Sequence, residues 1–301
     1  MSNPRKHVKY LVAVTSILTA LVAARPSVAQ GTLLWRQNLS GTFNSFAGAS
    51  FAEASSLAVD NLGNVVAAGR TGNTGISSNG ISSNFTVAKF NPHGTLLWQQ
   101  NLNGTAHGDD WASSVAVDKL GNVVAAGTTQ NTGTGFDFAV AKFNPHGTLL
   151  WQQSLNGSAN GNDGATSVAV DNLGNVVAAG STLNIIGPAD ELSDFTVAKF
   201  DGNGTLLWQR NLNGTAISSF DIAYSVAVDN LGNVVAAGIT VNTATRFDFT
   251  AARFDPHGTL LWQQNLNGTA NDHDGASSVA VDNLGNVVAA GGHFTVAKFN
   301  R

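Results

Sequence analysis

Carboxylate and aromatic side chains recur in one kind of loop along this chain of 301 residues, at places where they can meet a ligand. Carboxylate oxygens are the ligands that Ca²⁺ prefers in proteins, and flat aromatic rings offer an apolar face on which a sugar ring can stack. We therefore take these loop residues as candidate ligand-binding residues. They are Asp109, Asp110, Trp111, Asp163, Phe220, Asp221, Asp272, His273 and Asp274.

Each candidate also has a simpler structural interpretation. Asp and Asn side chains stabilise turns by bonding to the nearby backbone, and none of the loops has the twelve-residue alternation with a closing Glu of a calcium-binding loop. We therefore predict no metal site and no cofactor, and Ca²⁺ stays the alternative. Trp111 is explained more simply as a side chain that covers the edge of a sheet.

The sequence contains few of the residue patterns that catalysis requires. Glycoside hydrolysis requires two carboxyl groups across the bond to be cleaved, and Glu53 and Glu191 are the only Glu residues. The chain has no Gly-x-Ser-x-Gly segment, no phosphate-binding loop and no Cys nucleophile. We predict that the protein is not an enzyme and has no catalytic residues, with a glycoside hydrolase as the less favoured alternative.

Five near-identical repeats carry these loops. The segment Gly-Asn-Val-Val-Ala-Ala-Gly begins at Gly63, Gly121, Gly174, Gly232 and Gly285, which gives spacings of 53 or 58 residues. A Gly-Thr-Leu-Leu-Trp segment places Trp35, Trp98, Trp151, Trp208 and Trp262 at matching positions. Repetition with this period indicates a propeller or a solenoid built from one small structural unit.

Each repeat is predicted to form four short strands, which we call A to D in chain order. In the second repeat they are 114–118, 122–127, 137–143 and 147–155, rich in Val, Phe, Leu and Trp and separated by Gly, Asn, Asp and Pro. Outside the first thirty residues no segment has a sustained helical period, so helix is expected to be nearly absent.

Side-chain size along the repeat favours a propeller. Strands A and B carry small residues, and strands C and D carry the bulky residues Phe138, Phe143, Leu149, Leu150 and Trp151. The sheets of a propeller diverge outward from a central axis, so the outer strands need larger side chains to fill the gaps between them. We predict an all-β, five-bladed propeller of four-stranded antiparallel blades.

The two ends of the chain supply complementary parts of the last blade. Residues 31–38 form an isolated strand D, whereas 278–282, 286–291 and 294–299 form strands A to C with no strand D after them. Pairing the first strand with the last three would close the ring and cover its open edges. Residues 30–301 are thus predicted to form a single domain, and the protein to be a monomer.

The first 29 residues have the features of a secretory signal peptide. Arg5, Lys6 and Lys9 precede the apolar stretch 10–24, and small residues at 27–29 suit cleavage before Gln30. We expect export to the periplasm, the cell surface or the medium, with an uncleaved anchor as the alternative. Loss of four basic residues leaves 11 against 19 acidic ones, a net charge of −8, so nucleic acid and stable membrane insertion are not expected.

The repeat resembles a known family in its residues. Phe138-Ala-Val-Ala-Lys-Phe-Asn-Pro-His-Gly-Thr-Leu-Leu-Trp151, followed by Leu155-Asn-Gly-Ser and Ser167-Val-Ala-Val-Asp-Asn-Leu-Gly-Asn175, resembles the bacterial β-propeller repeat called SBBP. The resemblance covers all of the chain after the signal peptide and implies an exported propeller without an assigned reaction. Strands A and B are also similar to NHL repeats. Gly-Thr-Leu-Leu-Trp is similar to quinone-cofactor propellers, but the strand order around the Trp and the low cation content argue against a quinone site.

Two sets of repeated charged residues are predicted to serve the fold. Strand C contains a cation in every repeat, for which we expect ion pairs between blades or stems that cover apolar surface; these are Lys89, Lys142, Lys199, Arg253 and Lys298. Strand A ends in an Asp that we expect to cap the following turn, at Asp60, Asp118, Asp171, Asp229 and Asp282.

The variable loops predict where binding occurs. Because the strands of a blade are antiparallel, the A-to-B and C-to-D turns lie at one end and the B-to-C and D-to-A loops at the other. The first set hardly differs between repeats, and nearly all variation falls in the second. Loops on a rigid scaffold commonly bind ligands. We predict a binding module for a carbohydrate or a cell-surface protein, with a purely structural or assembly role as the alternative.

Overall fold

The computed structural model describes residues 32–40, 52–73, 82–185, 191–216, 220–268 and 273–301. The chain divides into two units, Met1–Leu34 and Trp35–Arg301, and all of the sheets lie in the second. The predicted signal peptide, residues 1–29, lies outside the described residues. In the part of the chain that the structure covers, no helix is long and apolar enough to cross a membrane.

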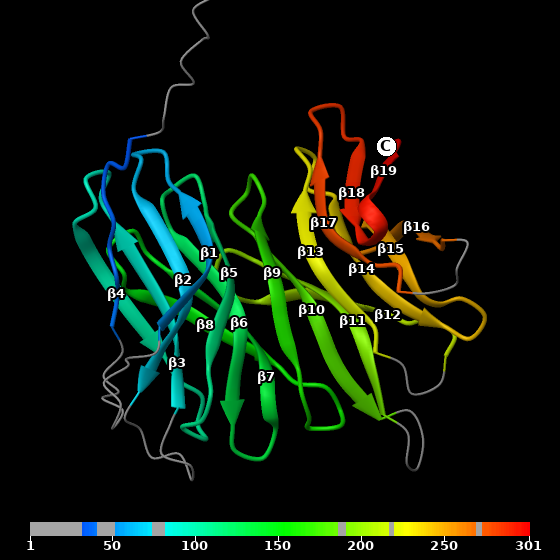
Figure 1. Ribbon diagram of the computed structural model, residues 1–301, viewed down its shortest axis with the longest axis horizontal. Coiled ribbons are helices and arrows are strands. Elements are labelled where there is room, and N and C mark those ends of the chain that lie inside the picture. The colour runs from blue at the N-terminus through cyan, green and yellow to red at the C-terminus, as the bar shows by residue number, and fades with distance from the viewer. Residues whose placement is uncertain (1–31, 41–51, 74–81, 186–190, 217–219, 269–272) are drawn as a thin grey trace, which may run out of the picture. The chain divides into compact units, whose positions relative to one another are not determined.

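The described strands form five antiparallel sheets that follow one another along the chain (Figure 1). Sheet 1 contains β1 (Ala52–Val59), β2 (Val65–Asn73), β3 (Ser82–Phe90) and β4 (Leu96–Leu102). Sheet 2 contains β5 (Trp111–Val117), β6 (Val123–Asn131), β7 (Gly135–Phe143) and β8 (Leu149–Leu155). Sheet 3 contains β9 (Gly164–Val170), β10 (Val176–Ile185), β11 (Glu191–Phe200) and β12 (Leu206–Leu212). Sheet 4 contains β13 (Ile222–Val228), β14 (Val234–Asn242), β15 (Arg246–Phe254) and β16 (Leu260–Leu266). Sheet 5 contains β17 (Ala276–Val281), β18 (Val287–Gly291) and β19 (Thr295–Phe299), with the one-turn helix η1 (Gly292–Phe294) before β19.

These sheets confirm the predicted all-β class and the four-stranded antiparallel unit. The strand bounds differ from prediction mainly in strand B of the second repeat, which continues to Asn131 instead of residue 127. The extension pairs Thr128 with Phe138 and Thr129 with Asp137. β-Branched threonines suit this half of the sheet, and the sequence reasoning assigned them to a loop because it stopped at Gly127.

The Asp at the end of each strand A caps the turn that follows, as predicted. In sheet 2 the Asp118 Oδ1 accepts hydrogen bonds from the backbone N–H groups of Leu120 and Asn122, and its Oδ2 accepts one from the Asn122 side chain. Gly121 adopts a φ of 80° in this turn, a conformation that favours glycine. The same bonds recur at Asp60, Asp171, Asp229 and Asp282.

The strand C cations pair within their own sheet, so the prediction of ion pairs between blades is wrong. Lys199 Nζ lies 3.0 Å from Asp171 Oδ2, and both side chains are buried. The contact to the next sheet is a hydrogen bond to a backbone oxygen, from Lys199 Nζ to the Gly232 carbonyl at 3.4 Å. A lysine stem on strand C reaches the end of strand A two strands away, and its charge is already balanced there.

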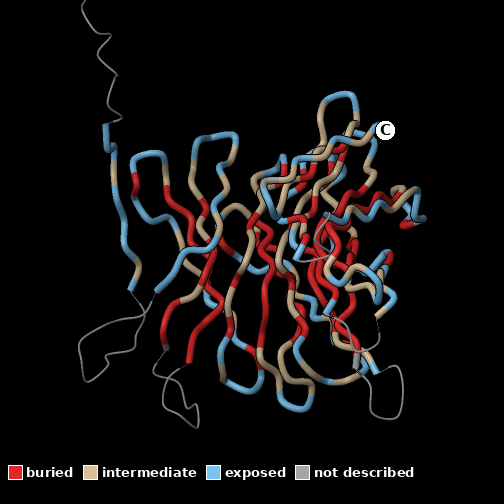
Figure 2. The backbone as a smooth tube through the Cα atoms, turned by 45° about the vertical axis from the view of Figure 1, so that its right-hand side comes forward, coloured by how far each residue is buried: buried red, intermediate tan, exposed pale blue. Residues whose placement is uncertain are grey.

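The core formed by the described residues consists of four apolar clusters. The cluster joining sheets 1 and 2 contains Val66 and Phe85 on one side and Val115 and Phe143 on the other. Buried segments accordingly run along the middle of the strands in Figure 2. The predicted size gradient holds for the strand C phenylalanines but is wrong for Leu149 and Leu150, which are 43% and 51% exposed because they lie at the start of the outermost strand.

The strand D tryptophans tie each sheet to the next. Trp98 of β4 packs on Phe143 with ring centroids 6.0 Å apart, and its Nε1 donates to the Pro145 carbonyl in the following sheet. Trp35 makes the same two contacts with Phe90 and Pro92. The segment around Trp35 therefore lies where the strand D of a sheet preceding sheet 1 would lie, although residues 32–40 form no strand.

Candidate functional site

Four loops connect strand D of one sheet to strand A of the next, and we call them the junction loops. They span 103–110, 156–163, 213–221 and 267–274, of which 217–219 and 269–272 are not described. Because the strands alternate in direction, the junction loops lie at the same end of the sheets as the B-to-C loops. We call this the loop end, and the opposite end, which carries the A-to-B and C-to-D turns, the turn end.

Each junction loop finishes in a buried Asp that holds the loop closed. The Asp110 Oδ2 accepts a hydrogen bond from the Gly104 N–H at 3.1 Å, and its Oδ1 accepts one from the Gln130 N–H at 2.7 Å. Asp163 bonds in the same way to the N–H groups of Gly157 and Leu183. A single carboxylate thus ties the start of the loop to its end and to strand B of the following sheet.

The third junction repeats this arrangement, and the fourth shares the bond from the loop glycine. Asp221 accepts from the N–H groups of Gly214 and Val241. Asp274 accepts from the N–H of Gly268 at 2.6 Å and lies 3.1 Å from His293 Nδ1. Four of the nine predicted site residues, Asp110, Asp163, Asp221 and Asp274, are therefore buried inside the junctions, with their oxygens directed at protein donors. The structure assigns them to the scaffold.

Burial shifts the pKa of two of these carboxyl groups. Removal from water raises the pKa of Asp110 to about 6, although the hydrogen bonds from Gln130 and Gly104 act in the opposite direction. Burial likewise raises the pKa of Asp163. Burial therefore disfavours the charged forms of Asp110 and Asp163, and hydrogen bonds from backbone N–H groups offset this effect only in part.

Of the other five predicted residues, four lie in the described part of the loop end. Asp109, Phe220 and His273 are exposed, and Phe220 keeps 56% of its surface. Trp111 is half-buried and packs on Phe136 with ring centroids 5.4 Å apart. Asp272 lies outside the described residues. In the described ranges, no three His, Asp or Glu side chains come together in a way that could hold a metal ion.

Two groups of residues that matter here were not singled out from the sequence. A Cβ at Gly104 would collide with the Gln130 carbonyl oxygen, and Gly157 and Gly214 have the same close neighbour in Leu183 and Val241. The signal was available, since an Asn-Gly pair opens every junction loop. The second group consists of the strand C residues that lie beside the junction loops. Their types differ from repeat to repeat, so no sequence pattern indicated them.

A further set of buried carboxyl groups lies in strand C. Asp137, Asp194 and Asp248 each use Oδ2 as an acceptor for an Asn side chain, and each Oδ1 has no hydrogen-bond partner among the described residues. Burial raises the pKa of Asp194, against the effect of its bonds from Asn211 and Asn184. The three carboxyl groups are part of the scaffold, and burial disfavours the charged form of Asp194.

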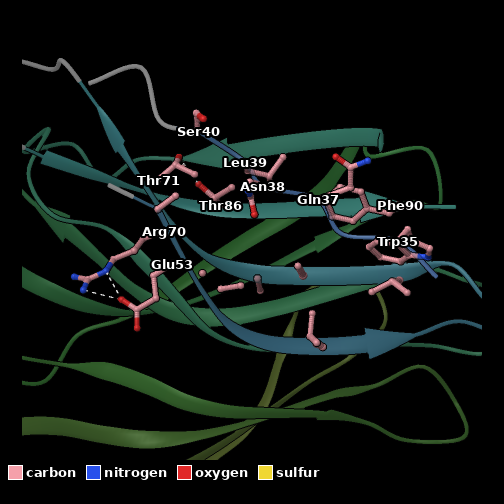
Figure 3. Close-up of a pocket in the computed structure, with 17 residues that line it drawn as sticks. Trp35, Gln37, Asn38, Leu39, Ser40, Glu53, Arg70, Thr71, Thr86 and Phe90 are labelled. Carbon is pink, nitrogen blue, oxygen red and sulfur yellow. Dashed lines mark hydrogen bonds and ion pairs between the residues drawn. The ribbon is translucent and has the colours of Figure 1, made fainter. Parts of the chain in front are cut away.

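An open cavity of about 600 Å³ lies on the outer face of sheet 1, beside the segment from Trp35 to Ser40 (Figure 3). Its wall includes Leu57, Val65 and Phe90, and at its rim Glu53 pairs with Arg70 at 2.8 Å. Glu53, one of the two carboxyl groups considered for hydrolysis, is thus engaged in an ion pair, and the side chain of Glu191 lies outside the described part.

Comparison with solved structures indicates the fold. The chain is similar to Raptor from Chaetomium thermophilum, with a TM-score of 0.52 and 12% identity over 81% of this chain and 19% of Raptor, so it spans about a fifth of that protein. It is also similar to a protein of unknown function from Bacteroides caccae, with a TM-score of 0.46 and 13% identity over 82% of this chain and 78% of the other. No curated protein matches the chain.

Comparison with protein families is more specific. Residues 83–301, well over half of the chain, match the family described as outer membrane protein assembly factor BamB. That match includes sheets 2 to 5, all four junction loops, β4 and nearly all of β3, but not β1 or β2. The chain therefore belongs to this family of β-propeller repeats, described as outer membrane protein assembly factor BamB.

Proposed function

We propose that the protein is an exported, non-enzymatic propeller that binds a carbohydrate or a cell-surface protein through its loop end. One observation carries this proposal. The four junction loops are held by the same buried Asp, which accepts a hydrogen bond from the N–H of the Gly near the start of the loop, whereas the exposed residues that they present differ from junction to junction. A constant scaffold with variable exposed side chains is the arrangement of a recognition surface.

Net charge and the types of exposed residue narrow the class of ligand. The chain that follows the signal peptide carries a net charge of −8, which disfavours nucleic acids and other polyanions. The exposed loop-end side chains include aromatic, carboxylate and amide groups, which suit the apolar faces and hydroxyl groups of sugars. A protein partner is the second candidate, because the family is described as an assembly factor.

The same proposal includes a closed ring of five blades, with the segment around Trp35 completing sheet 5. Sheet 5 has three strands and lacks a strand D, and Trp35 already makes the inter-sheet contacts of a strand D tryptophan. By the register of the complete sheets, Lys298 would pair with Trp35 and Val296 with Gln37. The described residues contain no pairing between 32–40 and β19.

Exposure at the two ends of the array supports closure. Leu57 in β1 is 67% exposed, whereas Val115, Val168 and Val226 at the matching positions are 7% exposed because the preceding sheet covers them. The side chain of Lys298 is 58% exposed, against 3% for Lys199. Closure would cover both surfaces and fill the cavity on sheet 1, which favours a monomer without open edges.

A glycan-array screen of residues 30–301, with and without Ca²⁺, tests the proposed function. The expected result is weak binding to one class of glycan, strengthened by several contacts on one ligand. If no glycan on the array binds, a carbohydrate ligand is excluded, and a protein partner or a structural role remains. Ca²⁺ that binds the native state must raise the melting temperature, so an unchanged melting temperature at millimolar Ca²⁺ would exclude calcium.

The hydrolase alternative has its own test. If the bound glycan is cleaved, Glu53→Gln and Glu191→Gln should abolish the cleavage, since hydrolysis by this chain would need a carboxyl pair. Binding without cleavage in the unaltered chain is the result expected here.

A further inference from the structure

The residue immediately before each buried junction Asp occupies one fixed place in every junction, and we call it the display position. These residues are exposed and unlike in type, whereas the residue that follows is Asp in all four. They are Asp109, Asn162, Phe220 and His273.

A strand C residue of the preceding sheet lies beside each display position, and we call it the companion position. The backbone fixes this proximity, because the N–H of the junction Asp donates to the carbonyl of the companion residue, at distances of 2.7 to 3.1 Å. Three of the four pairs also form an isolated parallel bridge. The companions are Ser83, Phe136, Ser193 and Phe247.

The side chains at each junction contact one another or stand beside one another. The Ser83 Oγ donates to Asp109 Oδ1 at 3.2 Å, as does its backbone N–H at 3.1 Å. His273 stacks on Phe247 with ring centroids 4.4 Å apart and planes 25° apart. Phe220 lies beside Ser193, and Phe136 lies beside Asn162. Trp111 also packs on Phe136.

Three consecutive junctions therefore hold an aromatic ring at the loop end, in Phe136, Phe220 and Phe247, and each has a polar or aromatic partner beside it. The rings come from different members of the pair: two from companions and one from a display position. Rings that recur from junction to junction suit a ligand that itself has a repeating unit.

We propose that the four display and companion pairs form a row of subsites for a neutral linear polysaccharide. This inference rests on the proposed function and adds the class of ligand and the residues that bind it. Packed sheets lie about 10 Å apart, a spacing close to the length of a disaccharide, so successive junctions match successive disaccharide units. Phe220 and the Phe247–His273 stack supply apolar faces, and the side-chain oxygens of Asp109 and Asn162 accept hydrogen bonds from sugar hydroxyl groups.

The residues at the display and companion positions favour a neutral polymer over a polyanion or an apolar peptide. The display and companion positions contain no Lys or Arg, so they offer no counter-charge for phosphate or sulfate groups. An apolar peptide would need a continuous apolar groove, whereas the display positions also hold the exposed polar side chains of Asp109 and Asn162.

Titration calorimetry with cellohexaose, chitohexaose and laminarihexaose on the full mature chain tests the inference. We expect one hexasaccharide to bind more tightly than its trisaccharide, because more subsites are filled. Phe220→Ala and Phe247→Ala should each lower the association constant about three- to tenfold, and the double variant should lower it further. Leu173→Ala is the control, since it removes an exposed apolar side chain at the turn end and should leave binding unchanged.

The possible failures are distinguishable. If none of the three glycans nor the array yields binding to the unaltered chain, the proposed carbohydrate function fails and the row fails with it. If a glycan binds but Phe220→Ala and Phe247→Ala, with unchanged melting temperatures, bind it as tightly as the unaltered chain, the row of subsites is overturned and the proposed function stands.

Discussion

At the residue scale, two kinds of buried Asp look alike in the sequence and differ in what their oxygens do. Asp163 uses both oxygens to accept backbone N–H groups, one from Gly157 and one from Leu183. Asp194 uses only Oδ2, which accepts from Asn184 and Asn211, while Oδ1 has no partner among the described residues. A buried oxygen without a donor costs free energy, and one with a donor stabilises.

The Asp-to-Asn substitution separates the two kinds. Asp163→Asn should lower the free energy of unfolding by about 1–3 kcal/mol, because its amide N–H₂ would face a backbone N–H. Asp194→Asn should raise it by about 1 kcal/mol at pH 7, because one amide oxygen still accepts both bonds and no buried charge remains. Urea unfolding of both variants measures this; a destabilised Asp194→Asn would contradict our description of that site.

The pH dependence of the Asp194 effect follows from its raised pKa. A carboxyl group whose pKa is higher in the folded state stabilises fully below its unfolded pKa and loses that contribution as pH rises through the folded pKa. The advantage of Asp194→Asn over the unaltered chain should therefore be small near pH 4 and grow toward pH 7. Urea unfolding at several pH values measures the difference; an advantage that shrinks as pH rises would have the wrong sign.

At the element scale, the junction loop depends on a close approach between backbones. The carbonyl of Leu183 in β10 occupies the space that a Cβ at Gly157 would need. Gly157→Ala should lower the free energy of unfolding by about 1–3 kcal/mol because the loop must shift. Gly202→Ala is the matched control: its Cβ meets its nearest neighbour at an ordinary 3.8 Å, and we expect a change within about 0.5 kcal/mol. Equal effects of the two substitutions would contradict the close approach.

The elements were also where sequence reasoning worked best. The four-strand unit and the Asp-capped turns follow from β-propensity and from Asp, Asn and Gly at fixed spacing, which act locally. The partner of Lys199 and the burial of Asp163 depend on which strands become neighbours in space, so no local pattern revealed them. Seven of the nine candidate residues lie in the described parts of the junction loops, Trp111 begins β5, and Asp272 lies outside the described residues. Burial divides the seven into scaffold and exposed members, which depends on how the sheets pack.

At the scale of the whole molecule, closure of the ring can be tested with an engineered disulfide, because the chain has no Cys. Gln37→Cys combined with Val296→Cys should form a bond within one chain if residues 35–38 pair with β19 in the register of the complete sheets. Gln37→Cys with Gln153→Cys is the control, since Gln153 is already paired with Val140 in sheet 2. Bonds formed only between two chains would contradict closure and indicate that a second copy fills the open edge.

The central claim is that the loop end recognises the ligand and the turn end does not. Amide hydrogen exchange in the presence and absence of the glycan identified by the array tests it most directly. The account predicts slower exchange in the junction loops, at 104–110, 157–163 and 214–216, with no change at the A-to-B turns such as 118–122. Slower exchange at the A-to-B turns, with the junction loops unchanged, would contradict it.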